Sequence, residues 1–182
     1  PRDLHRPKRL ALTILFMDLR GFSALCRKMA PEKVFDVLQL IYRTVHELIQ
    51  QAGGMVDKHM GDGLMALFGF NGISGMVAGR ECMRHLVRAY AALSPEIERL
   101  TNVELKLGMG LAAGEVVVGM LGTEMRNELA IIGGPVNLAS RLQEFTKYLF
   151  PRDTELAGRR CAAIGVCLPE LVDDTSDFIR FE

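Results

Sequence analysis

Apolar residues recur along this chain with two different periods, and each period predicts a different kind of element. Residues 10–17 form a continuous apolar run rich in β-branched and aromatic side chains, which is typical of a buried strand. Residues 56–68 contain two apolar runs that meet at a Gly-Asp-Gly turn, so we expect a β-hairpin there. Strict alternation over 103–111 predicts a half-buried strand. Two further extended runs, 114–121 and 128–132, predict a second hairpin.

Three other segments carry apolar residues at spacings of three and four, the period of a helix. The first begins at Pro31 and is closed by Gly53-Gly54. The second reaches as far as Pro95, and the third starts at Gly134-Pro135. The predicted apolar stripe of the second helix is Met83, Leu86, Val87, Tyr90 and Leu93, and that of the third is Leu138, Leu142 and Phe145.

The order of these elements predicts an α+β fold, with a βαββαβ ferredoxin-like core, extra strands, and helices on one face of a largely antiparallel sheet. A chain of 182 residues is long enough for one well-buried domain. We assign 1–9, a basic segment with two prolines, as a linker and 10–182 as the domain. After residue 150 the pattern weakens, and two short runs at 161–166 and 178–181 are candidate strands.

Charge and cysteine content exclude several classes of function. Lysine plus arginine and aspartate plus glutamate are balanced at 22 each, so no global field favours nucleic acid or an anionic membrane. The four cysteines form no CxxC pair, which predicts free thiols in a reducing compartment, best matched by the cytosol. No apolar run approaches the roughly 20 residues that span a bilayer. The first residue is proline rather than methionine, which suggests a piece of a longer protein.

Two acids stand at predicted strand ends: Asp18 follows the first strand, and Asp62 lies in the hairpin turn. Alone, Asp18 is more simply a cap or loop acid and Asp62 a turn residue. Together they favour a magnesium-type site, because hard divalent cations prefer oxygen ligands and keep waters and phosphates in their shell. A helix could begin shortly after Asp18, and the backbone N–H groups at its start could bind a phosphate. The candidate phosphate-binding residues are Leu19, Gly21, Phe22 and Ser23.

Polar residues on the third helix supply a second half of such a site. Asn137 and Arg141 are four residues apart and therefore share a face. Arginine can stabilise charge that develops on phosphate oxygens, and asparagine can orient a sugar; the simpler alternative is a solvated helix face. Alternation places Lys58 on one face with Val56 and Met60, so a lysine among apolar neighbours should have a partner.

Four segments carry a resemblance to a known family: FMDLRGFS at 16–23, KHMGDGLMALF at 58–68, GEVVVG at 114–119 and IGGPVNLASRL at 132–142. They occur in family order and resemble the class III nucleotide cyclase catalytic domain over roughly residues 10–148. The resemblance implies a head-to-tail homodimer with two sites at the dimer cleft, each built from both chains.

By position, the resemblance also implies roles for individual residues. Asp18 and Asp62 would hold two Mg²⁺ or Mn²⁺ ions. From the partner chain, Lys58 would meet the purine, Asn137 would orient the ribose and Arg141 would stabilise the pentavalent phosphorus. The reaction would be attack of the ribose 3′-oxygen on the α-phosphate, which gives a 3′,5′-cyclic nucleotide and pyrophosphate.

Base preference follows from hydrogen-bond polarity. Lys58 is a donor only and suits N1 of adenine, an acceptor, so ATP is favoured. Family members usually carry aspartate or threonine at the position of Ala130, whose methyl group cannot accept a hydrogen bond, so discrimination against GTP should weaken. Glu128 lies two residues earlier on the same strand face and is a candidate substitute.

The sequence therefore predicts an adenylyl cyclase catalytic domain that converts ATP to 3′,5′-cyclic AMP and pyrophosphate, with a regulatory domain on the same longer chain and no nucleic-acid partner. One alternative is a guanylyl or dual-specificity cyclase. Another is a degenerate domain that acts as a dimerisation or nucleotide-binding module. Ala130 alone favours that last alternative, since the candidate catalytic residues are all present.

Overall fold

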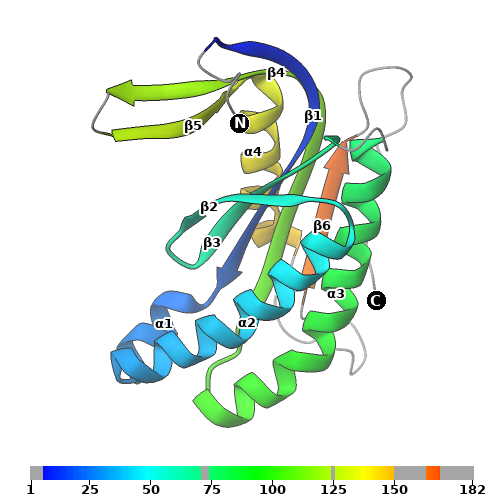
Figure 1. The fold of residues 1–182 in the computed structure, drawn as a ribbon. Coiled ribbons are helices and arrows are strands. Elements are labelled where there is room, and N and C mark those ends of the chain that lie inside the picture. The colour runs from blue at the N-terminus through cyan, green and yellow to red at the C-terminus, as the bar shows by residue number, and fades with distance from the viewer. Residues whose placement is uncertain (1–5, 71–73, 124–125, 150–162, 169–182) are drawn as a thin grey trace.

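The computed structural model describes residues 6–70, 74–123, 126–149 and 163–168. It contains a six-stranded sheet and four helices, so the α+β prediction is confirmed (Figure 1). The elements in chain order are β1 (Lys8–Arg20), α1 (Phe22–Lys28), α2 (Pro31–Gln51), β2 (Met55–Met60), β3 (Gly63–Phe68), α3 (Gly75–Thr101), β4 (Lys106–Thr123), β5 (Arg126–Ile132), α4 (Gly134–Leu149) and β6 (Ala163–Leu168).

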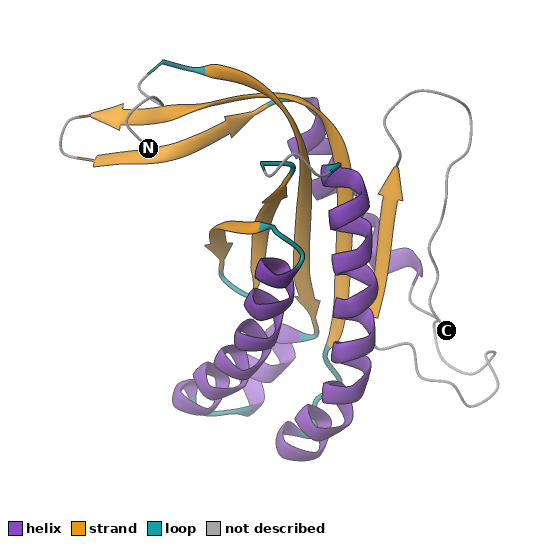
Figure 2. Ribbon diagram, turned by 45° about the vertical axis from the view of Figure 1, so that its right-hand side comes forward, coloured by secondary structure: helices purple, strands orange, loops and turns teal. Residues whose placement is uncertain are grey.

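The sheet has the strand order β2-β3-β1-β4-β5, with each neighbouring pair antiparallel. β6 pairs in parallel with β4, and the candidate strand at 178–181 lies outside the described residues. β4 is one strand of 18 residues, so the prediction of separate strands at 103–111 and 114–121 was wrong. Gly114, with φ 151°, lies inside β4 opposite Leu12 and does not interrupt its pairing with β1. Beyond this point, the β4–β5 hairpin projects as an arm (Figure 2).

Helices cover both faces of the sheet, so the prediction of helices on one face was wrong. Successive residues of β1 point to opposite faces of the sheet, and they belong to two different apolar clusters, so each cluster identifies one face. Leu15 and Met17 pack in the cluster that includes the buried residues of α2 and α3. Leu12 and Ile14 pack in the cluster that includes Ala139 of α4. We call these two sides the α2–α3 face and the α4 face.

α4 approaches the sheet through its backbone rather than through the predicted stripe. A Cβ atom on Gly110 would lie 2.2 Å from the Ala139 carbonyl oxygen, so only glycine fits there. The buried positions of α4 are consequently Ala139, Gln143 and Thr146. Leu138 and Phe145 are 38% and 43% exposed, so their assignment to the buried stripe was wrong. The same close approach buries β4 on both faces, where alternation had predicted a half-buried strand.

α3 continues through Pro95 to Thr101, six residues beyond the predicted end. Proline cannot donate to the carbonyl four residues earlier, which belongs to Ala91. The Ser94 hydroxyl donates to that carbonyl instead, at 3.5 Å, and Pro95 itself is exposed. The helix ends at Asn102, which has a positive φ of 52°. Within the described residues, no helix is both long and apolar enough to cross a membrane.

Candidate active site

Asp18 and Asp62 lie next to each other at one end of the sheet. Pairing of Met17 with Leu64 brings the β2–β3 turn, which contains Asp62, alongside the end of β1. A Cβ atom on Gly63 would lie 2.7 Å from the Met17 carbonyl oxygen, so glycine is required there, and 3.3 Å from Asp18 Oδ1. The pKa of Asp62 is raised by burial and then by the negative charge of Asp18, with which it shares a hydrogen bond. The carboxylate near the end of β1 and the carboxylate of the β2–β3 turn therefore lie close together.

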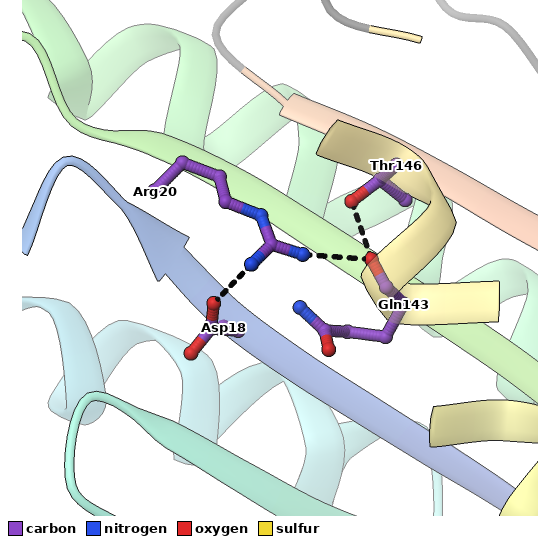
Figure 3. Close-up of polar contacts among 4 residues, drawn as sticks. All are labelled: Asp18, Arg20, Gln143 and Thr146. Atoms are coloured by element: carbon purple, nitrogen blue, oxygen red, sulfur yellow. Dashed lines mark hydrogen bonds and ion pairs between the residues drawn. The ribbon is translucent and has the colours of Figure 1, made fainter. Parts of the chain in front are cut away.

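Arg20 holds the Asp18 carboxylate from the α4 side (Figure 3). Its Nη1 lies 2.8 Å from Asp18 Oδ2, and its Nη2 donates to the Gln143 carbonyl at 2.9 Å. The Thr146 hydroxyl donates to the same carbonyl at 2.6 Å. The sequence analysis missed Arg20, although its position two residues after Asp18 places both side chains on one face of β1.

Tyr42 of α2 secures the turn that carries Asp62. Its hydroxyl oxygen lies 2.7 Å from the Gly61 carbonyl and 3.2 Å from the Gly63 carbonyl. The pKa of Tyr42 is raised to about 12 by burial and by the charges of Asp62 and Asp18, so the hydroxyl remains a donor at neutral pH. No local pattern marks this residue, because its contact joins positions 19 and 21 residues apart.

Lys58 lies on the α4 face because β2 contains a β-bulge. Val56 pairs with Ala66, whereas Lys58 pairs with the adjacent residue Met65, so Asp57 is the extra residue. Ala66 belongs to the α2–α3 cluster and Met65 to the α4 cluster. The prediction that Val56 and Lys58 share a face was therefore wrong. The expected partner exists: Lys58 Nζ lies 3.4 Å from Asp57 Oδ2.

Asn137 and Arg141 are exposed on α4 and make no side-chain hydrogen bond or ion pair with other residues that the structure describes. Thr146 contacts Gly108, the β4 partner of Asp18, so this part of α4 is level with the acids. Along the helix axis, at 1.5 Å per residue, Asn137 is about 14 Å and Arg141 about 8 Å from Thr146. Within one chain, the described residues show no hydrogen bond or ion pair between this polar pair and the acids.

The remaining candidates occupy two places. Leu19 is 2% exposed within the core, so only its backbone can reach a ligand. Gly21, with φ 92°, precedes α1, which begins at Phe22 as expected. Ala130 pairs with Gly119 in an unbroken β4–β5 ladder, so Glu128 shares its strand face. Ser23 is exposed in the first turn of α1.

The fold matches that of nucleotide cyclases. The family model of the adenylate and guanylate cyclase catalytic domain matches residues 6–148. The chain belongs to this family, the class III cyclases.

Two relatives of known sequence that match this chain are adenylate cyclases. The chain is 31% identical over 137 residues to an adenylate cyclase of Anabaena cylindrica, a match that covers 75% of this chain and 27% of that protein. It is 32% identical to the terminal-differentiation specific adenylate cyclase of Dictyostelium discoideum, over 75% of this chain and 6% of that one. The chain therefore spans less than a third of either relative.

Two solved structures have similar folds. The adenylyl cyclase CyaB from P. aeruginosa superimposes with a TM-score of 0.72 at 30% identity, over 77% of this chain and 74% of that one. The guanylyl cyclase Cya2 gives a TM-score of 0.69 at 32% identity, over 76% and 71%. The similarity thus extends to cyclases of either base preference.

Proposed function

We propose that this domain is an adenylyl cyclase that converts ATP to 3′,5′-cyclic AMP and pyrophosphate in a head-to-tail homodimer with shared active sites. One observation carries the proposal: the polar pair Asn137–Arg141 is exposed and makes no hydrogen bond or ion pair with the acidic pair Asp18–Asp62 or with any other residue that the structure describes. A second copy in the opposite orientation brings its own polar pair to each acidic pair.

The acidic pair fits two Mg²⁺ or Mn²⁺ ions. Burial and the Asp18 charge both disfavour the charged form of Asp62, and divalent cations held by the two carboxylates would remove that conflict. When bound, such ions supply charge neutralisation at the phosphates and increase the acidity of the attacking hydroxyl. Arg20 orients Asp18 for this role and is itself anchored to α4 through Gln143.

The other side chains bind and orient the nucleotide. The ammonium of Lys58 donates to N1 of adenine, and the Asn137 amide orients the ribose so that its 3′-oxygen faces the α-phosphate. The Arg141 guanidinium stabilises the charge that develops on the phosphate oxygens. The bond formed joins the 3′-oxygen to the α-phosphorus, the bond broken releases pyrophosphate, and the hydroxyl proton is released.

The second candidate is a dual-specificity cyclase, and Ala130 is the observation that favours it. Its methyl group accepts nothing from the 6-amino group of adenine, so half of the expected selectivity against guanine is missing. Glu128 lies on the same face of β5 and supplies a carboxylate two residues away. If Glu128 reads the amino group, Glu128→Ala lowers the ATP to GTP rate ratio; an unchanged ratio refutes this role.

Purified protein with Mn²⁺ and either ATP or GTP tests the activity, scored as cyclic product over a range of protein concentrations. We expect cyclic AMP as the main product and none from Asp62→Ala. Product from neither nucleotide, at concentrations where the dimer is present, would instead support a degenerate binding module.

Complementation tests the shared site. Asp18→Ala and Arg141→Ala chains should each be inactive alone, and their mixture should regain activity because one of the two sites in the heterodimer is intact. An inactive mixture in which heterodimers are shown to form would rule out the shared site.

A further inference from the structure

The bulge in β2 directs Lys58 to the α4 face, and Asp57 is the residue that creates it. An extra residue in one strand re-aims the side chains that follow. Without it, Lys58 would share the α2–α3 face with Val56, on the side of the sheet opposite Asn137 and Arg141. The bulge is therefore a condition for the purine contact proposed above.

The Asp57 carboxylate is buried beside the Lys58 ammonium. The Asp57 side chain is 3% exposed, whereas that of Lys58 is 40% exposed, and Oδ2 lies 3.4 Å from Nζ. Apart from Lys58, no residue that the structure describes donates a hydrogen bond to Oδ2. Burial raises the pKa of Asp57, and the Lys58 ammonium opposes that rise. A buried carboxylate oxygen whose one charged neighbour is a half-exposed lysine is costly to the fold, so its presence calls for a role outside folding.

A second acid acts on the same pair from β5. The charge of Glu128 also raises the pKa of Asp57, which places Glu128 within electrostatic range of it. Lys58 thus has one acid buried beside its ammonium, while the acid that acts on Asp57 from β5 is exposed. Because Asp57 is adjacent in sequence and shielded from water, its attraction for the ammonium is less screened than that of Glu128.

We propose that Asp57 is a positioning residue for purine recognition, which holds the Lys58 ammonium on the α4 face ready for the base. The inference rests on the proposed purine role of Lys58. An ammonium carries three donors, so one directed at Asp57 leaves two for the ring nitrogen and a further acceptor. Fixing the long lysine side chain before binding removes an entropic cost that the nucleotide would otherwise meet.

Asp57→Asn tests this role, because it keeps the size of the side chain and removes its charge. Affinity is measured with Mn²⁺ and 3′-deoxy-ATP or 3′-deoxy-GTP, which lack the attacking oxygen and cannot cyclise. We expect the Kd for 3′-deoxy-ATP and the KM for ATP to rise about three- to tenfold, the range for loss of one ordinary hydrogen bond, with a smaller change in kcat. Asp36→Asn, which removes the acid of the exposed Lys33–Asp36 pair on α2, should leave these values unchanged.

A double-mutant cycle separates positioning from a structural role. If Asp57 acts through Lys58, then Asp57→Asn combined with Lys58→Ala binds 3′-deoxy-ATP no more weakly than Lys58→Ala alone. Additive losses, or wild-type affinity for Asp57→Asn, would overturn the inference and leave the purine role of Lys58 intact. If Lys58→Ala itself changes neither affinity nor the ratio for the two nucleotides, that purine role fails, and the role of Asp57 fails with it.

Discussion

Removal of one hydroxyl group, in Tyr42→Phe, should weaken the metal site without touching either acid. The Tyr42 hydroxyl donates at 2.7 Å to the Gly61 carbonyl, in the turn that carries Asp62. A neutral hydrogen bond of this kind contributes about 0.5–1.5 kcal/mol. At 2–4 °C per kcal/mol for a domain of this size, the Tm should fall by about 1–6 °C. The ring that contacts His59, with centroids 4.8 Å apart, is retained.

The functional consequence follows from the position of the turn. If the whole free energy of this hydrogen bond serves to hold Asp62 in position, its loss lowers Mn²⁺ affinity by up to about tenfold, since 1.4 kcal/mol corresponds to a factor of ten. Titration calorimetry of Mn²⁺ in the presence of 3′-deoxy-ATP measures this. The matched control is Tyr90→Phe, whose buried hydroxyl donates at 3.1 Å to the Leu105 carbonyl. The control should lose similar stability and keep wild-type Mn²⁺ affinity; equal Mn²⁺ affinities for the two variants would refute the reasoning.

Two further predictions concern charge. The pKa of Asp62 is higher in the folded state than the value of 3.8 for the unfolded state. The protonated Asp62 carboxyl therefore contributes its full stabilisation below pH 3.8, and this stabilisation is lost as the pH rises through the folded pKa. Without metal, Asp62→Asn should therefore have a higher Tm than wild type at pH 7. Mn²⁺ at 100 times its Kd should raise the Tm of wild type by about 5–11 °C and leave the Tm of Asp62→Asn unchanged. A variant with a lower metal-free Tm that still gains this increase with Mn²⁺ would contradict the prediction. His46 Nε2 lies 2.8 Å from His59 Nε2, and burial, then His59, lowers the pKa of His46 below 6.5. The stabilisation by neutral His46 should be complete above pH 6.5 and decline below it, so the Tm difference between wild type and His46→Gln should shrink from pH 8 to pH 5. A difference that stays constant over this range would refute this expectation.

Local periodicity was sufficient for most elements, because the residues that define a strand or helix lie within it. It failed where the deciding contact comes from another element. The stripe of α4 was misassigned because Gly110, on a different strand, admits the helix backbone. The faces of β2 were misassigned because alternation assumes one residue per step, and the extra residue Asp57 breaks that rule.

The candidate site divides in the same way. Asp18 and Asp62 were predicted together because each marks a strand end, and antiparallel pairing of β1 with β3 brings those ends to one edge of the sheet. Arg20 could have been found by alternation from Asp18, whereas Tyr42 could not, since a helix gives no indication of which turn it will contact. Ala130 and Glu128 share a face in the sequence and in the β4–β5 ladder alike, because that ladder contains no bulge.

The misassigned stripe of α4 bears directly on the proposed dimer. Asn137, Arg141, Phe145 and Tyr148 follow one another at spacings of four, four and three, so they share one side of α4. Phe145 and Tyr148 are 43% and 64% exposed, with ring centroids 6.0 Å apart. Because glycines bring the helix backbone onto its own sheet, this aromatic pair is free to face a second chain. The side of α4 that offers the proposed catalytic groups is thus also the side with apolar surface still to bury, which couples assembly of the shared site to dimerisation.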